Sequence, residues 1–108
     1  EVVAYVLNAI GNFATSECMW PALQQLGAAR AVSTFIQQVD REDILINSLF
    51  CLSNMTGDPY QRAWMMQAEL YKIVWQHMTE NRNIKVLQYA LALLRGLAVE
   101  HEAQDILP

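Results

Sequence analysis

The stretch Ala9-Ile10-Gly11-Asn12-Phe13-Ala14 decides the fold, because related stretches follow it at a fixed spacing. It returns as CLSNMT at residues 51–56 and as LLRGLA at residues 93–98. Asn12, Asn54 and Gly96 therefore share one position at intervals of 42 residues (12 to 54, 54 to 96). A leucine five residues earlier keeps the same interval, as Leu7, Leu49 and Leu91. A period of about 40 to 47 residues with helical patterning is typical of stacked helical repeats.

The pattern of apolar residues and helix breakers divides this all-α chain into repeats of three helices. We expect one domain over 1–108: the third helix of a partial repeat at 1–14, complete repeats at 15–56 and 57–98, and the start of a further repeat at 99–108. The third helices are expected near 1–14, 43–56 and 84–98, stacked roughly parallel. Gly57-Asp58-Pro59 is the strongest boundary, since Asp58 can cap a helix and Pro59 fits its first position.

Composition excludes several classes of protein. With 54% hydrophobic and 17% charged residues, the chain is too apolar to be disordered. Its net charge of -4 argues against nucleic-acid binding, and its apolar runs are too short to span a membrane.

Cys18 and Cys51 lack metal-ligand spacing, and the N-terminal residues do not resemble a signal peptide. We expect two reduced thiols in a cytoplasmic or nuclear protein.

These residues resemble the armadillo repeat, whose third helix carries an Ala-Leu-x-Asn-Leu-Ala core after a Gly-Ala bend between the first two helices. Residues 9–14 closely match the core, residues 51–56 keep its leucine and asparagine, and Leu26-Gly27-Ala28 matches the bend. Gly96 replaces the third asparagine, and Glu69 replaces the second bend glycine. The resemblance covers the whole chain. It implies a right-handed α-α superhelix in which the third helices line a concave groove.

In the armadillo family, groove asparagines hydrogen-bond the backbone of an extended peptide, and Asn12 and Asn54 match that position. Nuclear-import members also place a tryptophan four residues before the asparagine. Here those positions hold Asn8, Phe50 and Ala92. The resemblance therefore implies a peptide-binding surface without the tryptophans of the import receptors.

The chemistry of asparagine also favours peptide binding, independently of the resemblance. An amide side chain carries both a donor and an acceptor, so it can bracket a peptide N–H and C=O. The alternative is that Asn12 and Asn54 are structural and bond the turn between repeats. We expect both to be solvent-accessible on one helix face, so that alanine replacements weaken partner binding and leave folding nearly unchanged. The candidate partner-binding residues are Tyr5, Asn8, Asn12, Asn47, Phe50, Asn54 and Tyr89.

Nothing in the sequence indicates catalysis, a cofactor or a metal. His77 and His101 lack any catalytic or metal-binding spacing. We interpret Asp58 and Glu100 as helix caps, and Trp20, Trp64 and Trp75 as core residues between helices. The sequence predicts a non-catalytic scaffold in a longer repeat array, which binds an extended peptide or a partner helix. The alternatives are a cargo adaptor resembling nuclear-import receptors and a regulatory module of a larger enzyme.

Overall fold

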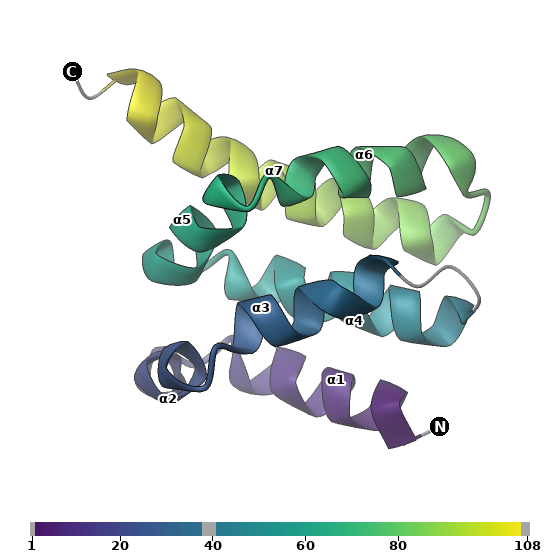
Figure 1. The fold of residues 1–108 in the computed structure, drawn as a ribbon, viewed down its shortest axis with the longest axis horizontal. Coiled ribbons are helices and arrows are strands. Elements are labelled where there is room, and N and C mark those ends of the chain that lie inside the picture. The colour runs from purple at the N-terminus through teal and green to yellow at the C-terminus, as the bar shows by residue number, and fades with distance from the viewer. Residues whose placement is uncertain (1, 38–40, 107–108) are drawn as a thin grey trace.

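The computed structural model describes residues 2–37 and 41–106, with side chains up to Val99. This part of the chain is all-α and contains no strand, which confirms the all-α part of the prediction (Figure 1). Two 3-10 segments, η1 and η2, accompany seven α-helices. In chain order the elements are α1 (Val2–Phe13), η1 (Glu17–Met19), α2 (Trp20–Gln25), α3 (Ala28–Ser33), η2 (Thr34–Gln37), α4 (Glu42–Met55), α5 (Pro59–Gln67), α6 (Leu70–Glu80) and α7 (Ile84–Ile106).

The helices recur with the period read from the sequence. The pair η1 and α2 corresponds to α5, α3 with η2 corresponds to α6, and α4 corresponds to α7. Each of these units begins 42 residues after its counterpart (17 to 59, 28 to 70, 42 to 84). The same sequence spacing therefore produces the same order of helices twice.

The third helices α1, α4 and α7 lie side by side and run in the same direction, as expected (Figure 1). Helix α4 packs against α1 on one side and against α7 on the other. Leu49 and Leu52 have no exposed surface, which confirms their predicted burial. At about 25 cal/mol per Å² of apolar surface removed from water, such side chains supply the main stabilisation of the stack.

Helix α5 begins with the predicted cap. The Asp58 carboxylate accepts a hydrogen bond from the backbone N–H of Tyr60 at 3.0 Å, and Pro59 occupies the first turn. Asp58 also accepts from Gln24 Nε2 at 2.7 Å, and only 2% of its surface is exposed. The capping interpretation is correct for Asp58, and the side chain of Glu100 lies outside the described residues.

Two expectations from the sequence differ from the structure, and one leucine differs in burial from its repeat counterparts. Helix α7 continues to Ile106 instead of ending near residue 98, because no glycine or proline lies between Val99 and Ile106, whereas Gly57 and Pro59 follow α4. Trp75 is 57% exposed and therefore is not a core residue. Leu91 is 59% exposed, although its counterparts Leu7 and Leu49 are buried.

Candidate partner-binding surface

Three asparagine side chains form a connected row across α1 and α4. Asn12 Nδ2 donates to Asn8 Oδ1 at 3.2 Å, one turn earlier on α1. Asn8 Nδ2 in turn donates to Asn47 Oδ1 on α4 at 3.5 Å. We call Asn8, Asn12 and Asn47 the amide row. Asn8 and Asn12 are exposed and Asn47 is half-buried, so the row lies at the surface where the two helices meet.

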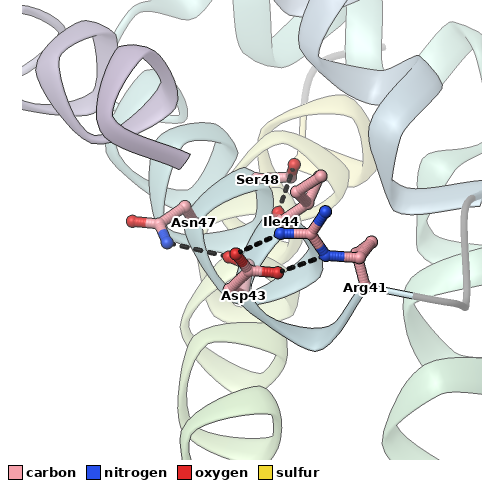
Figure 2. A network of polar contacts seen from close by, with 5 residues as sticks. All are labelled: Arg41, Asp43, Ile44, Asn47 and Ser48. Carbon is pink, nitrogen blue, oxygen red and sulfur yellow. Dashed lines mark hydrogen bonds and ion pairs between the residues drawn. The ribbon is translucent and has the colours of Figure 1, made fainter. Parts of the chain in front are cut away.

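The first turn of α4 fixes the orientation of Asn47 (Figure 2). Its Nδ2 donates to the backbone carbonyl of Asp43 at 2.8 Å, which leaves Oδ1 facing Asn8. Arg41 donates through Nε and Nη2 to the two carboxylate oxygens of Asp43, at 3.2 and 2.9 Å. This guanidinium holds the pKa of Asp43 below its usual value. Ser48 is buried and donates to the carbonyl of Ile44 at 2.7 Å.

Aromatic side chains continue the surface from α4 to α7. The rings of Phe50 and Tyr89 meet edge to face, with their centroids 5.5 Å apart. A Cβ atom built on Gly11 would lie 2.7 Å from the Phe50 ring, so the glycine allows α1 to approach this ring closely. Tyr5, on the first turns of α1, is 75% exposed. The Asn8–Asn47 and Phe50–Tyr89 pairs are each separated by 39 residues (8 to 47, 50 to 89), so both helix pairs meet in the same register.

Asn54 differs from the other asparagines because its amide is used within the fold. Its Nδ2 donates to the backbone carbonyl of Gly11 at 2.9 Å, and the side chain is half-buried. Helix α1 ends at Phe13, so this carbonyl belongs to the last turn, where the helix offers no backbone donor. The expectation that alanine at position 54 leaves folding nearly unchanged is therefore revised: Asn54 caps α1 from the next repeat.

The same capping role explains why Gly96 replaces an asparagine. Ser53 is the counterpart of Gly11, and its carbonyl accepts from the hydroxyl of Thr56 at 2.6 Å. A Cβ atom built on Gly96 would lie 2.2 Å from this Thr56 hydroxyl oxygen. The repeat at 15–56 thus caps its helix α4 with its own Thr56, and Gly96 leaves the space that Thr56 needs.

His77 has a structural partner in the preceding repeat. Buried His77 contacts the backbone carbonyl of Ile36 through Nε2, which joins α6 to η2 of the preceding repeat. The side chain of His101 lies outside the described residues. Among the described residues, no group of three or more His, Cys, Asp or Glu side chains is placed to hold a metal ion. No described helix is both long enough and apolar enough to cross a bilayer.

Sequence reasoning missed a cavity of about 470 Å³ between the α2–α3 bend and α5. Gln61 lies in its wall, with 3% of its surface exposed, and its Oε1 accepts from the backbone N–H of Ala29 at 3.2 Å. Gln61 Nε2 has no partner among the described residues. The guanidinium of Arg30 lies 5.8 Å from the ring centre of Trp64 on the same wall. No local motif marks these residues, because tertiary packing brings them together.

The structure thus places six of the seven candidate residues in contacts between α1, α4 and α7: the amide row, the Asn54–Gly11 bond and the Phe50–Tyr89 pair. These are Asn8, Asn12, Asn47, Phe50, Asn54 and Tyr89, while Tyr5 stands exposed on α1 beside them in sequence. Comparison of the chain with models of protein families and with curated proteins gave no match.

Proposed function

We propose that this protein is a non-catalytic scaffold that binds an extended peptide across α1, α4 and α7. The observation that carries the proposal is the amide row, which crosses from one repeat to the next at the surface. Each amide has two N–H groups and an oxygen that accepts two hydrogen bonds. The bonds within the row therefore leave donors and acceptors for the N–H and C=O groups of a peptide.

The neighbouring aromatic rings support the same proposal. Half-buried Phe50 and Tyr89 offer some apolar surface, with Phe50 three residues after Asn47 on α4, and exposed Tyr5 offers a ring with a polar end. Aromatic side chains of this kind supply large contact area at binding surfaces. The amides would bind the peptide backbone, and the rings would select apolar side chains at alternate positions. Asn54 contributes by holding α1 against α4.

The proposal also covers the superhelix formed by the repeats and the location of the protein in the cell. A right-handed superhelix of the armadillo kind, with these third helices along its inner face, would extend the surface over more repeats. The recurrence of helices every 42 residues supports this arrangement. The free thiols of Cys18 and Cys51 support a location in the cytoplasm or nucleus.

A phage-displayed library of random twelve-residue peptides, selected on the immobilised protein, tests the proposal. The selected peptides are then measured by isothermal titration calorimetry against a double variant, Asn8→Ala with Asn12→Ala. We expect it to bind about tenfold more weakly or worse, since each lost hydrogen bond costs about 1 kcal/mol. Gln76→Ala on the exposed face of α6 is the matched control and should keep the affinity.

Circular dichroism melts establish that both variants remain folded. Selected peptides that bind the double variant as tightly as the unchanged protein would refute the proposal. So would a selection that enriches no peptide above an uncoated surface.

A further inference from the structure

A second site lies between the two repeats, outside the surface formed by α1, α4 and α7. It is the cavity of about 470 Å³ that residues of the α2–α3 bend and of α3 form together with Tyr60, Gln61 and Trp64 of α5. We call it the bend cavity. Every lining residue is described, and the two sets come from adjacent repeats, so the cavity belongs to the contact between these repeats. Its volume is in the range of sites for small molecules.

Arg30 gives the bend cavity a positive charge. Among the described residues that line the cavity, Arg30 is the only charged one. Its guanidinium lies 5.8 Å from the ring centre of Trp64 and has no ion-pair partner among the described residues. A guanidinium carries five N–H donors in a fork that matches the two oxygens of a carboxylate. Contact with the Trp64 ring stabilises the cation in the cavity wall.

Gln61 adds a second donor to the same wall. Only 3% of its surface is exposed, and its Oε1 accepts from the backbone N–H of Ala29 at 3.2 Å. Its Nε2 is buried and has no hydrogen-bond partner among the described residues. A buried donor without a partner costs free energy, so an oxygen atom of a bound ligand would recover that cost. Arg30 and Gln61 thus both require an acceptor.

The carboxylate of Asp58, which lies next to this region, does not pair with Arg30. Asp58 Oδ1 accepts from the backbone N–H of Tyr60 at 3.0 Å, and Oδ2 accepts from Gln24 Nε2 at 2.7 Å. Asp58 is not among the lining residues. Both oxygens are therefore used within the fold.

We propose that the bend cavity binds a carboxylate attached to an apolar group. Arg30 and Gln61 would donate to the carboxylate, and the apolar group would contact Trp64, Tyr60 and Leu26. Tyr60 is 65% exposed and Leu26 is 79% exposed, so both offer surface to a ligand. A phosphate group carries up to two negative charges and matches the single cation less well. Free organic acids and acidic side chains of peptides both present such a carboxylate, and the experiment distinguishes them.

The test is an NMR titration of the isotope-labelled protein with phenylacetate, up to about 10 mM because a ligand of this size binds weakly. We expect shifts at the Trp64 indole and the Ala29 amide. Phenylacetamide has the same shape without the charge, and it should bind about tenfold more weakly or worse. The capped peptide acetyl-Leu-Asp-Leu-amide is titrated in parallel. Tighter binding of the peptide assigns the carboxylate to an acidic peptide, and tighter binding of phenylacetate assigns it to a free acid; both results support the proposal.

Two protein variants make a matched pair. Arg30→Gln removes the charge from the cavity, and Lys72→Gln removes the charge at the corresponding position of the next repeat (30 to 72), outside the lining. We expect Arg30→Gln to weaken phenylacetate binding about tenfold or more, and Lys72→Gln to change it less than about twofold. Arg30→Lys keeps the charge and loses the fork, so its affinity should lie between those of Arg30→Gln and the unchanged protein.

Gln61→Glu tests the buried amide. The variant keeps an oxygen for the Ala29 N–H but loses the Nε2 donor and adds a carboxylate, so it should not bind phenylacetate. Circular dichroism melts establish which variants are folded. Arg30 is exposed, so Arg30→Gln provides a test that does not depend on the buried amide.

Four results would overturn the proposal. These are no binding of either carboxylate ligand at about 10 mM, equal affinity for phenylacetate and phenylacetamide, equal losses in Arg30→Gln and Lys72→Gln, and shifts that map away from Ala29 and Trp64.

Discussion

Gly27 and Glu69 adopt the same left-handed backbone conformation at corresponding bends of the two repeats. Gly27 has φ 65° and ψ 40° between α2 and α3, and Glu69 has φ 56° and ψ 37° between α5 and α6. Glycine enters this region freely, whereas a residue with a side chain pays about 1 to 2 kcal/mol. The second bend thus keeps the geometry of the first at an energetic cost.

Replacing Glu69 by glycine should therefore stabilise the protein by about 1 kcal/mol. Urea unfolding monitored by circular dichroism measures the change. Glu69→Ala is the control, since it loses the ion pair with Lys72 but keeps a Cβ atom at positive φ. Equal stability of the glycine and alanine variants would contradict the claim that a side chain at this left-handed position lowers stability.

Asn54→Ala should lower the free energy of unfolding by about 1 kcal/mol, because the last turn of α1 loses the amide that caps Gly11. Asn12→Ala should change it by less than about 0.5 kcal/mol, since Asn12 is exposed and its amide donates to the equally exposed Asn8. Thermal melts of the two single variants test this difference. Equal stability losses would mean that Asn54 has no special capping role.

Gly96→Asn should destabilise the protein by about 1 to 3 kcal/mol, because the new side chain meets Thr56. In a Thr56→Ala background the cost should fall by about 1 kcal/mol or more, since positions 56 and 96 then match Ala14 and Asn54. A double-mutant cycle in urea measures this coupling. Additive effects of the two substitutions would show that Thr56 does not exclude the asparagine.

Leu52→Ala should cost about 2 to 5 kcal/mol, because Leu52 has no exposed surface and its truncation leaves a cavity. Leu91→Ala should cost less than about 0.5 kcal/mol, since Leu91 is 59% exposed on the open face of α7. The two variants remove the same atoms from third helices. Similar losses in a denaturant melt would refute the assigned packing.

Burial raises the pKa of the Cys51 thiol to about 12, whereas Cys18 is exposed. In the native protein at about pH 8, one thiol per chain should react rapidly with Ellman's reagent, and both should react in urea. The unfolded thiol ionises near pH 8.5, so the free energy of unfolding should fall as the pH rises from there towards about 12. A Cys18→Ser variant that still reacts rapidly when native would contradict the burial of Cys51.

The sequence predicted those features that depend on local pattern. The 42-residue spacing of Leu7 and Leu49 and the Asp58-Pro59 start signal place helices where the structure has them. The boundary expected near residue 99 relied on the period alone. Helix-forming residues after Ala98 continue α7, because no glycine or proline interrupts them.

Tertiary partners account for what the sequence did not predict. The acceptor of Asn54 is a carbonyl on another helix, 43 residues away (11 to 54), and local pattern does not identify it. A tryptophan outside the third helices is more often a core residue than a binding platform, but Trp75 on α6 is 57% exposed. The predicted partner-binding residues remain Tyr5, Asn8, Asn12, Asn47, Phe50 and Tyr89.

The position of α4 between α1 and α7 has a consequence for local unfolding and for the order of folding. Loss of α1 breaks one packed interface between third helices, whereas loss of α4 breaks two. Amide protons in α1 should therefore exchange with solvent through local unfolding of that one helix. Those in α4 should exchange only when the whole stack is disrupted. Since each repeat contacts only its neighbours, folding should start around α4 and spread outward in both directions.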